Sequence, residues 1–215
     1  MCQAGDIPMP SRRPAIFPPS TCHDRAVTPC YGCWGHRMLT DRFARALVYA
    51  ERLHRRQRRK GNDIPYVAHL LAVSATVLEY GGDEDTAIAA LLHDAVEDQG
   101  GLPTLREIEA QFGSRVAAIV EACTDSVTAD PAAKLPWEDR KRSYLAHLAE
   151  ANADVALVAA ADKLHNLTAM IRDVRRDGAA AMNRFKAPPE RQLWYFGEVV
   201  KALGQHRATA PVEEI

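Results

Sequence analysis

The sequence predicts an all-α domain, a bundle of about seven or eight helices. No segment alternates polar and apolar residues with the period of two that marks a half-buried strand. From about residue 39 onward, apolar residues instead recur at the three- and four-residue spacing of an amphipathic helix, and short stretches with Gly or Pro separate these runs. The part of the chain that can form a core should therefore be helical throughout.

Most of the expected helices carry a start or a stop signal. Thr40 or Asp41 can cap the first helix, and paired glycines follow the second and the third. Thr104 and Glu107 have the spacing of a capping box, which predicts that a helix begins at Thr104. The expected helical segments are residues 39–57, 65–82, 83–101, 104–113, 114–125, 138–150, 154–178 and 188–206.

The chain divides into three parts by composition. Residues 1–37 are Pro-rich and aperiodic and cannot bury enough apolar surface to offset the entropy of ordering, so we expect a disordered extension. The folded domain is expected over residues 38–207, with Met38 as an alternative start, and a flexible tail over residues 208–215. Zinc held by Cys30 and Cys33 of the extension is a minor alternative to reduced thiols.

The composition excludes two classes of partner. With 47% hydrophobic residues and a formal net charge of -1, the chain lacks the excess of Lys and Arg that binding to nucleic acid by bulk charge requires. No apolar run approaches the roughly 18 residues that a membrane span needs, and the chain does not open with the apolar stretch of a secretory signal. We therefore expect a cytoplasmic protein that acts on a small molecule.

Ionisable side chains interrupt three otherwise apolar helices. His93 and Asp94 lie within IAALLHDAVEDQ, His69 interrupts PYVAHLLAV, and Asp162 interrupts VAAADKLHNL. Burying such groups is costly unless a metal ion or a partner charge compensates for them. Because helix bundles build metal sites from polar groups that several helices direct inward, we predict that these four residues are the ligands of one metal ion.

The types of residue in this set indicate the chemistry. Two imidazoles and two carboxylates suit a borderline-to-hard divalent ion such as Mn²⁺ or Fe²⁺, which acidifies bound water and neutralises charge on a phosphoryl oxygen. Glu97 and Asp98, one turn beyond, can hold or deprotonate the attacking water. Taken singly, each His can be a hydrogen-bonded core residue and Asp162 an ion-pair partner, so the interpretation depends on their joint occurrence.

Five motifs between about residues 42 and 203 carry a family resemblance: QRRKGNDIPYVAH, ALLHDAVEDQ, FGSRVAAIVEACTD, EDRKRSYL and ADKLHNL. They resemble the HD-type hydrolase domain of RelA/SpoT-type alarmone enzymes, and most of all the stand-alone small alarmone hydrolases related to the metazoan SpoT homologue. The resemblance implies an HD-domain helical bundle that uses Mn²⁺. It also implies an enzyme that removes pyrophosphate from the 3′ position of guanosine 3′,5′-bis(diphosphate), ppGpp, or of pppGpp, giving GDP or GTP.

The resemblance also implies a role for individual residues. The four predicted ligands match its metal site, and Glu97 with Asp98 matches its catalytic acidic pair. The residues that it places at the substrate are Arg59 and Lys60 near the nucleotide, Tyr66 in the pocket, and Asn166 at the sugar. A flat guanidinium such as that of Arg59 can stack on a base, while the ammonium of Lys60 offsets phosphate charge.

The chain departs from the family pattern in the segment 126–137, which is longer than usual and has Val127 in place of a Lys. If that Lys binds the distal phosphates, Lys134, Arg140 or Arg142 can substitute for it, and we expect Arg142 at the substrate. The departure keeps open an HD phosphohydrolase of another nucleotide, such as an adenine alarmone, NADPH or a deoxynucleotide. A non-catalytic nucleotide-sensing module is a further alternative. A synthetase domain is not expected, because too few residues follow the helical domain.

Overall fold

The computed structural model describes residues 39–125, 135–204, 206, 211 and 215, all within the unit that spans residues 36–215. Several expectations fall outside the described residues: the disorder of residues 1–37, the zinc alternative in that segment, the roles of Val127 and Lys134, and most of the tail after residue 207.

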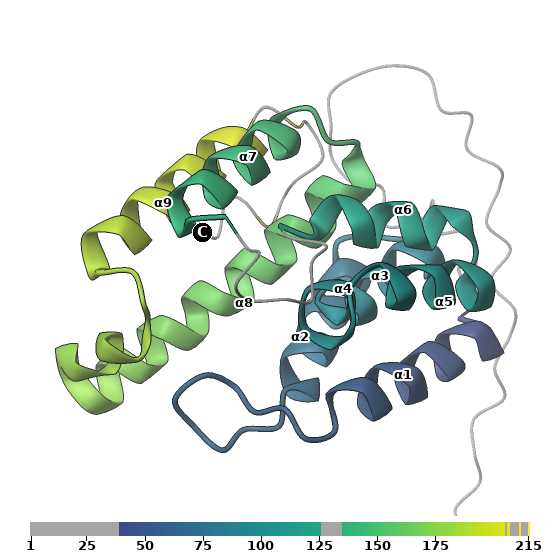
Figure 1. Ribbon diagram of the computed structural model, residues 1–215, viewed down its shortest axis with the longest axis horizontal. Coiled ribbons are helices and arrows are strands. Elements are labelled where there is room, and N and C mark those ends of the chain that lie inside the picture. Colours follow the sequence, from purple (N-terminus) through teal and green to yellow (C-terminus); the bar gives the residue numbers. More distant parts are fainter. Residues whose placement is uncertain (1–38, 126–134, 205, 207–210, 212–214) are drawn as a thin grey trace, which may run out of the picture. The chain divides into compact units, whose positions relative to one another are not determined.

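Every regular element among the described residues is helical, so the all-α prediction is confirmed; the pairing of Arg58 with Pro65 is an isolated bridge. The helices, shown in Figure 1, are α1 (Asp41–His54), α2 (Val67–Glu79), α3 (Glu84–Leu92), α4 (Ala95–Gln99), α5 (Leu102–Phe112), α6 (Ser114–Cys123), α7 (Trp137–Ala149), α8 (Ala153–Asp177), the 3₁₀ helix η2 (Gly178–Arg184) and α9 (Pro189–Leu203). None of the described helices combines the length and the apolar character needed to cross a membrane.

The long helix α8 packs into two apolar clusters. The first joins the buried faces of α1, α2, α3, α5 and α6, and α8 adds Val155 and Val158 to it. The second lies between α7, α8 and α9, and α8 adds Ala156 and Ala160 to it. Figure 1 shows α8 running between these two groups of helices. Side chains from both groups of helices can therefore lie close to a residue in the middle part of α8, such as Asp162.

The dipeptide His93–Asp94 interrupts a segment that the sequence predicted as one helix. The apolar helix α3 ends at Leu92 and α4 begins at Ala95. Asp94 lies between them with φ −96° and ψ −3°, in a sparsely populated backbone region where turn residues and many active-site residues are found. The prediction of one uninterrupted helix over residues 83–101 was therefore wrong, because a turn at His93–Asp94 separates α3 from α4.

The first residues of α1 and α5 test two of the capping predictions. Thr40 caps α1, because its hydroxyl oxygen accepts a hydrogen bond from a backbone N–H of the first turn at 3.2 Å. The capping box predicted at Thr104 does not form, since α5 already begins at Leu102. Gly101, with φ 65°, supplies the left-handed turn before α5, and Pro103 suits the first turn because its missing N–H would have no partner there.

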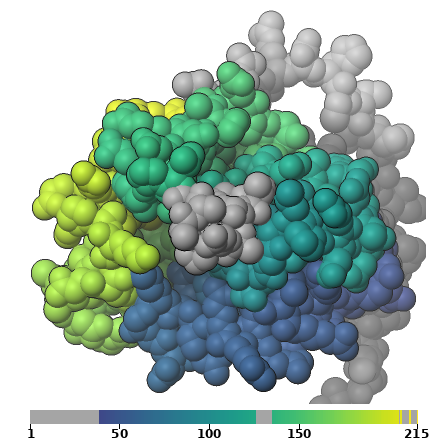
Figure 2. Space-filling model, viewed as in Figure 1, coloured from purple at the N-terminus to yellow at the C-terminus, as the bar shows by residue number. Residues whose placement is uncertain are grey.

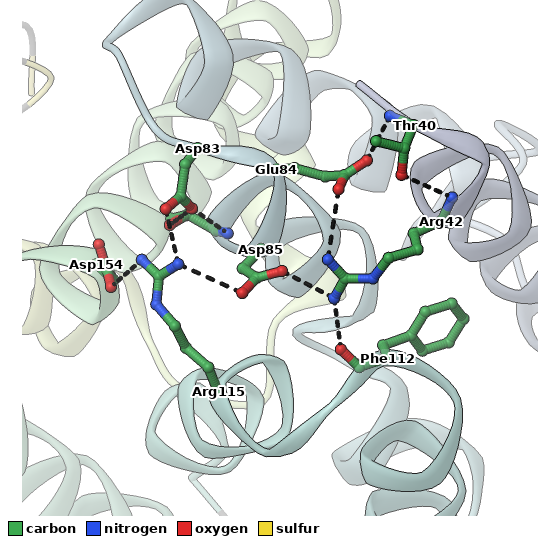
Figure 3. Close-up of polar contacts among 9 residues, drawn as sticks. Thr40, Arg42, Asp83, Glu84, Asp85, Phe112, Arg115 and Asp154 are labelled. Carbon is green, nitrogen blue, oxygen red and sulfur yellow. Dashed lines mark hydrogen bonds and ion pairs between the residues drawn. The ribbon is translucent and has the colours of Figure 1, made fainter. Parts of the chain in front are cut away.

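Two arginines join the starts of several helices through one acidic cluster, shown in Figure 3. Arg115 of α6 lies 2.7 Å from Asp83, the cap of α3, and 2.7 Å from Asp154 in the first turn of α8. Asp85 lies 3.4 Å from Arg115 and 2.8 Å from Arg42 of α1, so it links the two arginines. The carboxylates also lie where helix N-termini favour negative charge.

We expect this cluster to make stability depend on pH. Burial alone would raise the pKa of Asp83, but hydrogen bonds from Arg115 and Thr86 lower it from 3.8 to about 2. Folding therefore favours the charged form of Asp83. Its contribution to the stability of the folded state is present above about pH 4 and is lost as the pH falls toward 2.

The substitution Asp83→Asn, which keeps a capping oxygen, tests this dependence. The melting temperature of the variant should lie below that of the wild type above pH 4, and the difference should disappear near pH 2. Asp63→Asn, at an exposed site with no ion pair among the described residues, is the matched control. A difference for Asp83→Asn that does not change with pH would contradict the prediction.

Candidate metal centre

The four predicted ligand residues meet at one place. His69 comes from α2, His93 and Asp94 from the turn between α3 and α4, and Asp162 from the middle of α8. Nε2 of His69 lies 3.2 Å from Oδ1 of Asp162 and 3.5 Å from Oδ2 of Asp94. Nε2 of His93 lies 3.0 Å from the same Asp94 oxygen and 3.6 Å from the same Asp162 oxygen. The imidazoles expose only 1% and 3% of their side chains, so both rings are shielded from bulk water, whereas the side chain of Asp94 is 23% exposed.

Both imidazoles point an unpartnered nitrogen into the cluster. Nδ1 of His93 lies 2.8 Å from the backbone oxygen of Ala90, so this nitrogen carries the proton and donates it. Nδ1 of His69 lies 2.7 Å from Nδ1 of His165. Burial, with the nearby His69 and Arg59, lowers the pKa of His165 to about 4, so this ring is neutral at pH 7 and can accept the proton of His69. When neither ring carries a second proton, both Nε2 atoms are buried lone pairs with no hydrogen-bond partner among the described residues.

The charges around these lone pairs favour a cation. Two carboxylates face two imidazole lone pairs, and this arrangement is repulsive unless a positive charge lies between them. Burial alone would lower the pKa of His93, but Asp94 and Asp162 raise it well above its ordinary value, so a proton occupies the position when no metal does. Two nitrogen and two oxygen donors fit a divalent ion of borderline or hard character.

Neighbouring side chains hold the two carboxylates in place. Tyr66 donates its hydroxyl proton to Oδ2 of Asp94 at 2.6 Å, and both burial and this carboxylate raise the pKa of the phenol. Asn166 donates to Oδ1 of Asp162 at 2.5 Å, and the ammonium of Lys163 pairs with Oδ2. Such outer hydrogen bonds fix the orientation of metal ligands. Tyr66 and Asn166, which the sequence assigned to substrate, thus also contact predicted ligands.

A loop before α2 brings Arg59 and Lys60 to the same region. In Figure 2 the blue surface of this loop meets the yellow-green surface of η2. Gly61 turns the loop with φ 80°, and a Cβ there would lie 2.7 Å from a carbon of Arg184, so a larger residue would push the loop away from η2. Arg59 reaches the cluster, since its guanidinium donates to Oδ1 of Asn166 at 2.7 Å.

Glu97 and Asp98 of α4 lie beside the cluster without joining it. Oδ2 of Asp98 accepts a hydrogen bond from the side-chain amide of Gln57 at 2.8 Å. An oxygen of Glu97 lies 4.0 Å from the guanidinium of Arg140. Each carboxyl group therefore has a polar neighbour outside the predicted ligands, and such a neighbour can hold an acid–base group in position.

Two adjoining cavities open at the cluster. The larger, of about 990 Å³, is bounded by His69, Glu97, Asp98 and the basic residues of the loop. The smaller, of about 180 Å³, is bounded by the other three predicted ligands and by Cys123. Burial raises the pKa of the Cys123 thiol to about 12, so it is protonated and unsuited to bind metal at neutral pH. Several residues line both cavities: Tyr66, Glu97, Lys141, Lys163, Asn166 and Tyr195.

One predicted substrate residue lies elsewhere. Arg142 pairs with Glu138 at 2.8 Å, rests 5.1 Å from the ring centre of Trp194 and is 62% exposed. It borders neither cavity. The prediction placed it at the substrate as a possible substitute for the family Lys that Val127 replaces, but on α7 its side chain packs on Trp194 and not at a cavity. We therefore leave Arg142 out of the candidate site.

Sequence reasoning also missed several residues that contact the cluster or its cavities. Lys163 and His165 lie in the motif ADKLHNL, next to a predicted ligand, but a spacing pattern does not tell which of them face inward. Tyr195 lies in an expected helical segment and is 5% exposed, so its sequence context does not separate core packing from a place at both cavities. The only sequence feature that could have indicated a role for Lys141 at the site was its place in the basic motif EDRKRSYL.

His165 is expected to tune metal binding by fixing the tautomer of His69. In His165→Ala the Nδ1 proton of His69 loses its acceptor, so affinity for Mn²⁺, measured by calorimetry on the metal-free protein, should fall about 10- to 100-fold. His147→Ala, the same substitution at an exposed site on α7, is the control. Equal affinities for all three proteins would show that the contact between the two imidazoles has no role in ligation.

Comparisons with known proteins agree with this geometry. A family model described as the HD domain matches residues 46–184. The guanosine-3′,5′-bis(diphosphate) 3′-pyrophosphohydrolase MESH1 of Xenopus tropicalis is 42% identical over 161 residues, which cover 74% of this chain and 82% of the relative. Human MESH1 is 39% identical over 134 residues, which cover 61% of this chain and 68% of the relative. The solved structure of a metazoan ortholog of SpoT, which hydrolyzes ppGpp and plays a role in starvation responses, matches with TM-score 0.64 and 31% identity, covering 82% of this chain and 92% of that one.

Proposed function

The chain belongs to the HD-domain family, and from that premise we propose that it is a metal-dependent hydrolase that removes pyrophosphate from the 3′ position of ppGpp or pppGpp, giving GDP or GTP. The observation that carries the proposal is the convergence of two unpartnered imidazole nitrogens and two carboxylates beside two adjoining cavities. The activity named for the relatives supports the choice of substrate. We assign the hydrolase domain to residues 38–207.

The proposed metal ligands are His69, His93, Asp94 and Asp162, and the proposed ion is Mn²⁺, with Fe²⁺ as an alternative that suits the same donors. When bound, such an ion acidifies water and neutralises charge on a phosphoryl oxygen. The chain contributes the orientation of these ligands: Ala90 and His165 fix the imidazoles, and Tyr66 and Asn166 fix the carboxylates.

Glu97 and Asp98 are the proposed acid–base pair. In the reaction, the oxygen of water forms a bond to the phosphorus that is attached to O3′ of the ribose. The bond between that phosphorus and O3′ breaks, and O3′ gains a proton. Glu97, which borders both cavities, would accept the proton of the water. Asp98, oriented by Gln57, would give its carboxyl proton to O3′, and the proton taken up by Glu97 would then restore Asp98 through solvent.

The larger cavity is the proposed nucleotide site. Its volume of about 990 Å³ is at the upper end of the range of about 300–1,000 Å³ usual for small-molecule sites. Arg59 lies 5.6 Å from the ring centre of Tyr66 and presents a flat group on which a base can stack. Lys60 borders the same cavity and would offset phosphate charge, while Asn166, which also borders it, would contact the sugar.

The test is incubation of the full chain with ppGpp and Mn²⁺, with release of GDP and pyrophosphate measured by chromatography. We expect turnover by the wild type and none by Asp94→Ala. A panel of other nucleotides separates the alternatives, because Val127 replaces a family Lys and substrate choice can differ here. Turnover of an adenine alarmone, NADPH or a deoxynucleotide in place of ppGpp would replace the proposed substrate, and tight binding of ppGpp without turnover would indicate a sensing module.

A further inference from the structure

His54 and Gln57 form hydrogen bonds next to Asp98, one member of the proposed acid–base pair. His54 is the last residue of α1 and is 2% exposed, and Gln57 lies in the loop that leads from α1 to α2 (Figure 1). The backbone N–H of Gln57 donates to the oxygen of His54 at 2.9 Å, and the N–H of Tyr66 donates to the oxygen of Gln57 at 3.1 Å. The backbone of Gln57 is therefore held between the end of α1 and the start of α2.

The side-chain amide of Gln57 has donors on one side and an acceptor on the other. Its Oε1 lies 2.7 Å from Nδ1 of His54 and accepts a hydrogen bond from the side-chain amide of Gln99 at 2.6 Å. Its Nε2 donates to Oδ2 of Asp98 at 2.8 Å. The reversed amide would place its oxygen against this carboxylate and its NH₂ against that of Gln99, and both contacts would be repulsive. The surroundings of Gln57 thus select one of its two orientations.

The position of the proton on His54 agrees with this orientation. Burial lowers the pKa of His54 below its ordinary value, so the ring is neutral at pH 7 and has one proton to place. Because Oε1 of Gln57 is an acceptor, the proton belongs on Nδ1. Nε2, which is buried and has no hydrogen-bond partner among the described residues, then keeps its lone pair. His54 therefore donates to Gln57.

Asp98 depends on a fixed neighbour for its orientation. The residue is exposed and borders the larger cavity, and an exposed side chain can occupy several rotamers unless a contact holds it. A proton-transfer group contributes only when it lies within hydrogen-bond reach of the atom that it serves. Gln57 borders the same cavity, whereas His54 borders neither. Any effect of His54 on the reaction must therefore pass through Gln57.

We propose that His54 is a positioning residue, which donates from Nδ1 to Gln57 and so holds the amide of Gln57 with its NH₂ toward Asp98. The role in catalysis rests on the proposed function, whereas the orientation of the amide does not. Because His54 borders neither cavity, its loss should lower kcat and leave KM and metal affinity nearly unchanged.

Three substitutions of His54 separate positioning from packing. His54→Leu has a similar volume and can pack against Tyr66, whose ring centre lies 5.2 Å from that of His54, but it cannot donate. His54→Asn places an amide N–H near the position of Nδ1, and His54→Gln places one near Nε2. Relative to the wild type, kcat on ppGpp should fall about 3- to 15-fold in the Leu and Gln variants, as expected for a lost neutral hydrogen bond, and stay within about twofold in the Asn variant.

Stability should rank the variants in a different order. His54→Asn leaves a cavity in the core and should have a lower melting temperature than His54→Leu, although it has the higher kcat. A purely structural role would give the opposite result, with the less stable variant also less active. His147→Leu, the same substitution at an exposed site on α7, is the matched control and should have wild-type kcat.

A double-mutant cycle tests whether His54 acts through Gln57. Gln57→Met removes the amide and should lower kcat about 10- to 100-fold, with KM and Mn²⁺ affinity within about threefold of the wild type. Adding His54→Leu to Gln57→Met should change kcat less than about twofold, because the connection to Asp98 is already broken. Losses that multiply, equal kcat in His54→Leu and His54→Asn, or a parallel loss of Mn²⁺ affinity would each overturn the positioning role.

Nitrogen NMR of the full chain, labelled at histidine and measured before Mn²⁺ is added, separates this inference from the proposed function. The signal that His54→Leu removes should show a proton on Nδ1. If no nucleotide is cleaved but this tautomer is found and Gln57→Met changes it, the orientation of the amide stands, and the proposed function fails together with the role in catalysis. If ppGpp is cleaved and His54 carries its proton on Nε2, the function stands and the inference is wrong.

Discussion

Replacing His93 by alanine is expected to abolish metal binding and to lower kcat/KM on ppGpp by on the order of 10³-fold or more. The reason is geometric, because the hydrogen bond from Nδ1 to the oxygen of Ala90 leaves Nε2 of His93 as the only nitrogen of this ring that can coordinate. The ring is 3% exposed, so no other side chain can move into its place without repacking α3.

Two measurements check this prediction. Metal content after gel filtration should be near one equivalent for the wild type and near zero for His93→Ala. Added Mn²⁺ should raise the melting temperature of the wild type, since a ligand that binds only the folded state stabilises it, and should leave that of the variant unchanged. Arg142→Ala is the control, because Arg142 pairs with Glu138 and borders neither cavity. Full activity in His93→Ala would remove His93 from the site.

The helical fold was predictable because periodicity and caps are local properties. The apolar spacing of α8 and the capping hydroxyl of Thr40 can each be recognised within one turn of sequence. The turn at His93–Asp94 could not be predicted in this way, because the local sequence is compatible with an unbroken helix. Tertiary packing ends α3 at this point. The last apolar residues of the helix are fully buried, and the ionisable pair that follows faces the metal centre.

The candidate ligands were predictable for a different reason. An ionisable residue within an apolar helix implies compensation nearby, and three such helices imply a shared partner. The same logic fails for residues that act from amphipathic helices. Lys141 and Arg142 are neighbours in a basic motif, yet only Lys141 borders a cavity, because successive residues on a helix point in different directions. Local sequence does not fix which face of α7 meets α8 and α9.

Replacing Glu97 by glutamine is expected to lower kcat by about 10²- to 10⁴-fold while metal binding is retained. Glutamine keeps the shape of the side chain and an acceptor oxygen, but it cannot take up the proton of the attacking water. The carboxyl group of Glu97 borders both cavities, and one of its oxygens lies 4.0 Å from the guanidinium of Arg140. The four proposed ligands instead contact one another through their imidazole nitrogens and carboxylate oxygens. Its loss should therefore affect the chemical step and leave the ion in place.

The pairing of two readouts makes this prediction specific. In Glu97→Gln, Mn²⁺ affinity by calorimetry and KM for ppGpp should stay within about threefold of the wild type, because an acid–base group contributes mainly in the transition state. In His93→Ala, by contrast, activity and metal are lost together. If Glu97→Gln also loses its metal, then Glu97 is a ligand of the ion, and the acid–base role would pass to Asp98, whose orientation by Gln57 at 2.8 Å is independent of Glu97.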